Sequence, residues 1–273
     1  MLEKIAVFIL GSCLGSFLNV CIHRLPKEES VVSPRSSCPK CKAKIKWYDN
    51  IPLLSYLILR AKCRSCREKI PLRYPLVELI TAGLALALYL KFGLSFLFFK
   101  FIFFFALLVL VSFIDIDYHA IPVYLCVIGI AVGLALTVWP TLMMLKSGWF
   151  NPGSLPLVRA FRGLLFGFGF TYLFKFFGDV FIDFYLKIRK KESIEGERES
   201  LGLGDVDFMG MVGVFLGVKS VVLVFFLAPF FAVIYSVFAI IFKRSHLIPY
   251  LPYLSLATLT VFFWGDKILS FIL

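Results

Sequence analysis

Runs of about 20 apolar residues recur along most of this 273-residue chain, and they constrain its fold more than any other feature. A helix needs about 20 predominantly apolar residues to cross the hydrocarbon core of a bilayer. With 60% hydrophobic residues, the chain is too apolar to solvate a globular surface. We therefore predict an all-α integral membrane bundle of about eight transmembrane helices. The predicted segments are 4–22, 75–91, 94–114, 121–139, 156–178, 206–218, 220–242 and 253–272.

Basic residues are concentrated in the polar loop between the first two apolar segments. Thirteen Lys or Arg and four acidic residues lie from His23 to Arg73, so this loop carries +9 of the chain's net charge of +12. Basic loops beside spanning helices stay in the cytoplasm, and they attract anionic lipid headgroups. We therefore predict a cytoplasmic loop that contacts membrane lipid, and no nucleic acid partner. Alternation of the helices then places the connections 115–120, 179–205 and 243–252 on the same side.

Two C-x-x-C pairs lie in the basic loop, Cys38 with Cys41 and Cys63 with Cys66. Stable disulfides are disfavoured in the reducing cytoplasm. Each C-x-x-C turn presents two sulfurs to one point, and two such turns suit a tetrahedral Zn²⁺. We predict a structural zinc site, because four thiolate ligands leave no open position for a substrate. Redox-active thiols and four unrelated cysteines are the alternatives.

Acidic residues gather at the ends of two apolar segments, both on the predicted cytoplasmic side. Asp115 and Asp117 close one segment, and Asp205 and Asp207 open another. Ionisable groups at membrane depth are costly unless they are paired or hydrated, so each is a functional candidate. Two carboxylates within hydrogen-bond reach share a proton and titrate as one unit. The ionised member can activate a water for amide hydrolysis, and the protonated member can donate to the leaving amine.

The acids have other possible roles. Gly202 and Gly204 would let a backbone approach Asp205 closely, as cleavage of a peptide requires. An Asp at a helix end is also a common cap, and Asp205 is placed to cap the helix that follows it. Intramembrane acids also relay protons. A proton-coupled transporter with a structural zinc loop is therefore an alternative function.

The ordered motifs of the chain resemble the type IV prepilin peptidase family, whose members are GxGD-type aspartic membrane proteases. The resemblance covers nearly the whole chain and includes the two aspartate motifs. The other motifs are Gly15-Ser16-Phe17-Leu18-Asn19-Val20, Arg24-Leu25-Pro26, Ser37-Cys38-Pro39, Trp47-Tyr48-Asp49-Asn50-Ile51-Pro52-Leu53-Leu54-Ser55 and Arg73-Tyr74-Pro75-Leu76-Val77-Glu78.

The resemblance implies a leader peptidase of the bacterial inner membrane with its active site on the cytoplasmic side. Family members cut the basic leader from type IV prepilins and pseudopilins, and many then methylate the new N-terminus with S-adenosylmethionine. Matched residue by residue, the catalytic aspartates fall on Asp115, which opens a D-x-x-x-x-x-I-P pattern ending at Pro122, and on Asp205, which closes G-x-G-D. The family's zinc ligands fall on the four loop cysteines.

The chain departs from the family pattern at two positions. Ala61 stands where the family usually has Gly, in the region associated with methyl transfer, and Asp207 stands where a Lys is common. Candidate residues for methyl transfer are Glu78, Asn19 and Lys62. Glu78 and Asn19 suit a helix-packing hydrogen bond equally well.

The resemblance also divides the chain and suggests where the leader binds. We predict a first transmembrane helix over 1–22, a zinc-binding loop associated with methyl transfer over 23–74 and a peptidase core over 75–273. Asp117, Asp207 and the acids between Glu192 and Glu199 are expected to receive the basic leader. A presenilin-like intramembrane protease, which also uses G-x-G-D, is a further alternative. That class expects its first Asp well inside a helix and a later Pro-Ala-Leu element, whereas Asp115 lies at a predicted helix end and the chain has no such element.

Overall fold

A computed structural model describes the chain except for residues 120–121, 149–150, 190–199, 242–248 and 273. The described part is helical and contains no β-strand, only two isolated backbone bridges. Seven of the described helices are long and apolar enough to cross a membrane. The prediction of an all-α membrane protein is therefore confirmed. The chain divides into two compact units, Met1–Tyr118 and His119–Leu273.

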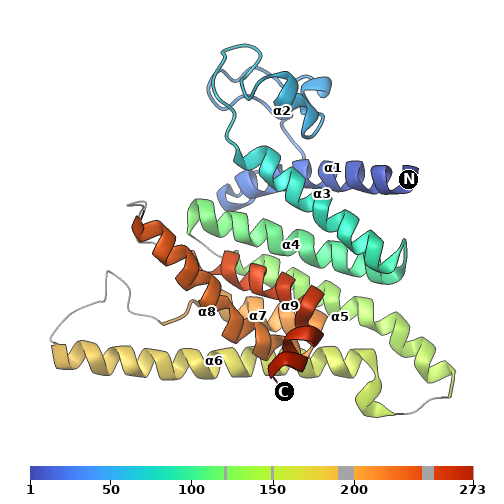
Figure 1. The fold of residues 1–273 in the computed structure, drawn as a ribbon, viewed down its shortest axis with the longest axis vertical. Coiled ribbons are helices and arrows are strands. Elements are labelled where there is room, and N and C mark those ends of the chain that lie inside the picture. The colour runs from blue at the N-terminus through green and yellow to red at the C-terminus, as the bar shows by residue number, and fades with distance from the viewer. Residues whose placement is uncertain (120–121, 149–150, 190–199, 242–248, 273) are drawn as a thin grey trace. The chain divides into compact units, whose positions relative to one another are not determined.

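Three long helices and a loop form the first unit (Figure 1). α1 (Leu2–Arg24), α3 (Arg73–Phe92) and α4 (Phe96–Tyr118) pack on one another. The loop between α1 and α3 contains two 3₁₀ turns, Leu25–Lys27 and Trp47–Asn50, and the short helix α2 (Leu54–Ile58). It extends away from the three long helices of this unit.

Small residues let α1 and α3 approach closely. A Cβ on Gly11 would lie 2.7 Å from the Cβ of Ala85, and a Cβ on Gly15 would lie 2.7 Å from the Cα of Glu78. Lipid tails provide no hydrophobic drive for helix association, so membrane helices rely on such close packing of small residues. This contact fixes α3, and with it Glu78, beside the first helix.

Five helices form the second unit: α5 (Val123–Lys146), α6 (Pro156–Arg189), α7 (Leu203–Leu216), α8 (Val218–Ile241) and α9 (Leu251–Ile272). A 3₁₀ turn, Pro152–Ser154, precedes α6. α7 packs against α5, α6 and α8, and nearly all of its residues are buried. Gly163 and Gly167 of α6 face the carbonyls of Gly213 and Met209, where a side chain would collide with the backbone of α7.

Three predicted spans differ from the structure. The segment predicted over 121–139 corresponds to α5, which continues to Lys146. The predicted segment 206–218 corresponds to α7, which has 14 residues and a length of about 21 Å, less than the hydrocarbon core of about 30 Å. The predicted eight spans are therefore seven membrane-length helices and one short buried helix in the described part. α6 continues past its predicted end at 178 to Arg189, because the charge of Asp179 is paired with Lys175 on the same helix.

Candidate active site and metal centre

The four loop cysteines form a cage whose sulfurs all lie within 4.8 Å of one another. The Cys38 and Cys66 sulfurs are 3.8 Å apart, and those of Cys41 and Cys63 are 4.0 Å apart. Zinc–sulfur bonds of about 2.3 Å in a tetrahedron place the sulfurs about 3.8 Å apart, whereas a disulfide needs about 2.05 Å. The donor set and its spacing therefore fit one tetrahedral metal ion. The prediction that the two pairs converge is confirmed.

The two C-x-x-C turns of the cage have the same backbone geometry. The Lys42 amide donates to the Cys38 carbonyl at 2.9 Å, and the Arg67 amide donates to the Cys63 carbonyl at 3.0 Å. Lys42 and Arg67, each directly after its second cysteine, adopt φ values of 58° and 59°. The two short turns thus present their sulfurs in equivalent ways. The sulfurs that contact each other belong to residues far apart in the chain, 28 residues for Cys38 and Cys66 and 22 residues for Cys41 and Cys63.

Backbone amides tune the thiols of the second turn. The amides of Cys66 and Ser65 lower the pKa of Cys63 to about 7. The Glu68 amide lowers the pKa of Cys66, but desolvation and the neighbouring thiols outweigh it and raise that pKa to about 11. Crowded thiols cannot all ionise without a cation among them. A metal ion, which binds the thiolate form, would relieve this repulsion.

One ion pair joins the two cysteine turns to each other, and a second attaches them to the rest of the loop. Lys40 of the first turn pairs with Glu68 beside the second turn. Arg64 makes a bidentate contact with Asp49, with its Nη2 2.6 Å from Oδ1 and its Nε 2.8 Å from Oδ2. The hydrogen bond from Arg64 holds the pKa of Asp49 below its usual range. The 3₁₀ turn that contains Asp49 is thereby attached to the second cysteine turn.

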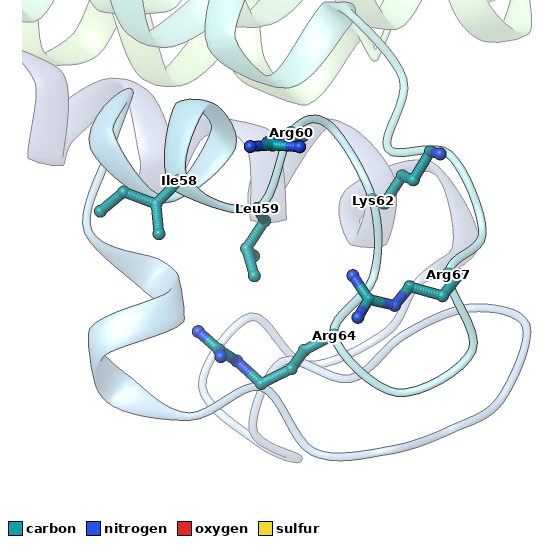
Figure 2. Close-up of a pocket in the computed structure, with 6 residues that line it drawn as sticks. All are labelled: Ile58, Leu59, Arg60, Lys62, Arg64 and Arg67. Atoms are coloured by element: carbon teal, nitrogen blue, oxygen red, sulfur yellow. The ribbon is translucent and has the colours of Figure 1, made fainter.

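A cavity of about 350 Å³ opens beside the second cysteine turn. Figure 2 shows its lining side chains arranged around the hollow. They are Ile58, Leu59, Arg60, Lys62, Arg64 and Arg67. Four thiolates around a divalent ion would carry net negative charge, which the four cations of this lining would offset. The predicted methyl-transfer residue Lys62 lies here.

Glu78 attaches the loop to the helices. Glu78 is 8% exposed, and its carboxylate accepts a hydrogen bond of 2.8 Å from the amide of Leu53. Leu53 has φ 62° and ψ −49°, a conformation that ordinary residues seldom adopt. Asn19 is also buried, and its Nδ2 donates to the Tyr74 carbonyl at 3.0 Å. Both residues therefore make packing hydrogen bonds. Among the described residues, none donates to Asn19 Oδ1.

The first aspartate motif lies in the last turn of α4. Asp115 is 6% exposed. Asp117, two residues further on, is paired with Arg73 at the start of α3. The charge of Asp117 is therefore already compensated within the first unit. Pro122, the last residue of the D-x-x-x-x-x-I-P pattern, is the N-cap of α5 in the second unit.

The second aspartate motif forms the start of α7. Gly202 is the N-cap, with extended backbone angles, and Asp205 lies in the first helical turn. Oδ2 of Asp205 accepts a hydrogen bond of 3.1 Å from the Gly202 amide, and the carboxylate is 5% exposed. The helix thus begins three residues before the predicted start at 206, so Gly202 is the N-cap and Asp205 binds the N-cap amide from within the first turn. Gly204 is buried and Asp207 is partly buried.

Residues of α6 that the sequence did not single out hold the approach to this motif. Lys175, 7% exposed, donates to the Leu201 carbonyl at 2.7 Å and pairs with Asp179 at 3.0 Å. Asp179 accepts hydrogen bonds from the amide and the hydroxyl of Ser200, each 2.7 Å long. A cation inside a Phe-rich helix was the signal that could have revealed this network, because buried charges in membrane helices need partners. The acids 192–199 lie outside the described residues.

Helices of membrane length, buried carboxylates at helix ends and a four-cysteine cage define a multi-pass membrane protein with a metal-binding loop. Two family models match parts of the chain. Residues 9–92 match the Bacterial Peptidase A24 N-terminal domain, and residues 102–237 match the Type IV leader peptidase family. The first match contains the cysteine loop, and the second contains both aspartate motifs.

Characterised relatives lead to the same family. A prepilin leader peptidase/N-methyltransferase of Myxococcus xanthus is 38% identical over 79% of this chain, although the match covers 56% of that protein. The type 4 prepilin-like proteins leader peptide-processing enzyme of Escherichia coli O78:H11 is 34% identical, over 90% of this chain and 88% of that protein. A Bacillus subtilis prepilin leader peptidase/N-methyltransferase is 28% identical over 97% of this chain. No solved structure matches. The chain belongs to the type IV leader peptidase family.

Proposed function

We propose that the protein is an aspartic endopeptidase that removes the basic leader from type IV prepilins or pseudopilins. In this proposal, Asp115 and Asp205 are the catalytic pair. The observation that carries it is that both carboxylates are buried at helix ends, with Asp205 fixed through Oδ2 to the Gly202 amide. A buried carboxylate can keep a proton at neutral pH, as the acid of the pair requires, whereas a hydrated surface acid ionises.

The chemistry assigned to the pair is acid–base catalysis of amide hydrolysis. The ionised carboxylate removes a proton from the attacking water while the protonated one donates to the carbonyl oxygen and then to the leaving amine. A resting state with one proton on the pair supplies both functions. Gly202 and Gly204 carry no side chains, so a peptide backbone can approach Asp205 closely.

The leader peptide is basic, and we propose that Asp207 contributes to its recognition. Asp207 is partly exposed, two residues beyond Asp205 on α7. Asp117, by contrast, is engaged by Arg73. We therefore assign Asp117 to packing of the first unit rather than to the leader. The basic loop, cytoplasmic by its charge, is proposed to lie at the inner membrane's lipid surface, and no nucleic acid partner is proposed.

Methylation of the new N-terminus is the proposed second activity, with S-adenosylmethionine as the methyl donor. The names of the relatives and the match over residues 9–92 support it. The buried Asn19 Oδ1 can accept a hydrogen bond from the donor's amino groups, and Lys62 is a second candidate contact. Zn²⁺ in the cysteine cage is proposed to be structural, because all four coordination positions are filled by protein.

Purified protein in detergent, incubated with a prepilin, tests the peptidase assignment. The Asp115→Asn and Asp205→Asn variants keep the shape of each side chain and remove its ability to ionise, so each is expected to lose cleavage by about 10³-fold or more. Asp183→Asn, an exposed aspartate on α6, is the matched control and keeps wild-type activity. Cleavage by either catalytic variant at the wild-type rate would remove that residue from the mechanism.

A further inference from the structure

We propose that Lys175 and Asp179 of α6 form a clamp that positions Asp205 for catalysis by holding Ser200 and Leu201 in place. This inference rests on the proposed catalytic role of Asp205. The clamp is defined as the side chains of Lys175 and Asp179 with their bonds to Ser200 and Leu201. It acts on the backbone that leads into α7.

Both side chains of the clamp bind the segment that leads into α7. Lys175 Nζ donates to the Leu201 carbonyl at 2.7 Å, and Asp179 Oδ1 accepts from both the amide and the hydroxyl of Ser200 at 2.7 Å. The Ser200 hydroxyl also lies 3.0 Å from the Lys175 carbonyl. The two charges neutralise each other at 3.0 Å. Charge-assisted bonds of this kind are about twice as strong as neutral ones.

The steric fit of the segment is independent of these charges. Gly178 lies on the same face of α6, between the two clamp residues. A Cβ there would lie 2.6 Å from the Cβ of Ser200, closer than side chains can approach. Ser200 is therefore seated directly on the helix surface at the position where only glycine leaves room.

The clamp is connected to the aspartate by a short chain of bonds. Leu201 precedes Gly202, the N-cap of α7, and the Gly202 amide is the donor that orients Asp205 Oδ2. Release of Leu201 would free Gly202, and with it the orientation of the carboxylate. A displacement of about 1 Å at a reacting group can lower the rate on the order of 100-fold. Burying Lys175 in a spanning helix costs free energy, and the orientation of Asp205 is the function that this burial serves.

Kinetics of clamp variants in detergent test the proposal. Lys175→Met is expected to lower kcat on the order of 10- to 100-fold with little change in KM, and Lys175→Arg, which keeps the cation, restores part of it. Gly178→Ala should lower kcat without altering any charge. Lys187→Met, an exposed lysine about three turns along α6, is the control and keeps wild-type kcat.

A double variant separates positioning from fold stability. Lys175→Met/Asp179→Leu leaves no unpaired buried charge, so its melting temperature should recover toward that of the wild type. Its kcat should stay low because Ser200 and Leu201 remain untethered. Recovery of kcat together with the melting temperature would overturn the clamp and leave a purely structural ion pair.

Hydrogen exchange provides a readout that needs no activity. The amides of Ser200 and Gly202 should exchange faster in Lys175→Met than in the wild type or in Lys187→Met. Unchanged exchange at these amides would refute the clamp whatever the kinetics. Absence of prepilin cleavage by the wild-type protein, with faster exchange in Lys175→Met, would instead contradict the peptidase assignment and retain the anchoring of the segment.

Discussion

The contact between Glu78 and Leu53 predicts a specific change in the dynamics of the cysteine loop. The hydrogen bond is 2.8 Å long and its acceptor is a buried carboxylate. Bonds to charged groups contribute about 1.5–3 kcal/mol and neutral ones about 0.5–1.5 kcal/mol. Glu78→Gln, which keeps an acceptor, should therefore weaken the contact by about 1 kcal/mol, and Glu78→Ala by about 2 kcal/mol.

The strained backbone of Leu53 makes this contact decisive. A residue at φ 62° and ψ −49° costs on the order of 1–3 kcal/mol, comparable to the bond that holds it. Without the carboxylate, little opposes the relaxation of this turn. Hydrogen exchange of the Leu53 amide measures the opening of this turn directly. A loss of about 1.4 kcal/mol raises the equilibrium constant for opening, and with it the exchange rate, tenfold. We expect the exchange to be about fivefold faster in Glu78→Gln and about 30-fold faster in Glu78→Ala.

Glu3→Gln changes a carboxylate on the same two-helix pair, where Glu3 accepts from the Tyr89 hydroxyl, and it should leave Leu53 exchange unaltered. Equal exchange in the wild type and Glu78→Ala would show that the carboxylate does not hold the loop. Loss of methylation in Glu78→Gln with unaltered exchange would instead assign Glu78 directly to methyl transfer.

Three further predictions concern the metal cage and the helix packing. Elemental analysis should find about one zinc per chain. Either Cys66→Ser or a strong chelator should make the loop sensitive to protease. A protease-resistant loop in metal-free wild-type protein would contradict the metal cage. Ala61 has φ 58°, which costs about 1 kcal/mol relative to Gly, so Ala61→Gly should slow zinc loss to a chelator by up to about fivefold. Gly167→Ala would press a Cβ against the Met209 carbonyl and should destabilise the protein by about 1–3 kcal/mol in thermal unfolding, whereas Gly169→Ala, with open space around it, should not.

The sequence predicted those features whose cause is local. The C-x-x-C turns were predicted to converge because each short turn already presents its sulfurs in one direction. The start of α7 was predicted three residues too late, so its N-cap is Gly202, and Asp205 accepts from the Gly202 amide inside the first turn. The predicted end of α6 at 178 was wrong, because a charged residue such as Asp179 suggests a helix end unless its partner is known. That partner, Lys175, also bonds to Leu201, which is 26 residues away. Such long-range pairings leave no periodic pattern in a sequence.

Glu78 and Lys175 carry opposite charges, and each is a buried charge that binds a backbone group of a neighbouring segment. A loop that leaves a membrane helix carries amide and carbonyl groups, and these need partners wherever water is scarce. A buried charge on a spanning helix likewise needs a partner. The Leu53 amide satisfies the carboxylate of Glu78, and the Leu201 carbonyl satisfies the ammonium of Lys175. Each pairing removes two costs at once and fixes a functional segment, the cysteine loop in one unit and the G-x-G-D turn in the other. It follows that a neutral residue of similar size at either position should loosen one segment without loosening the other.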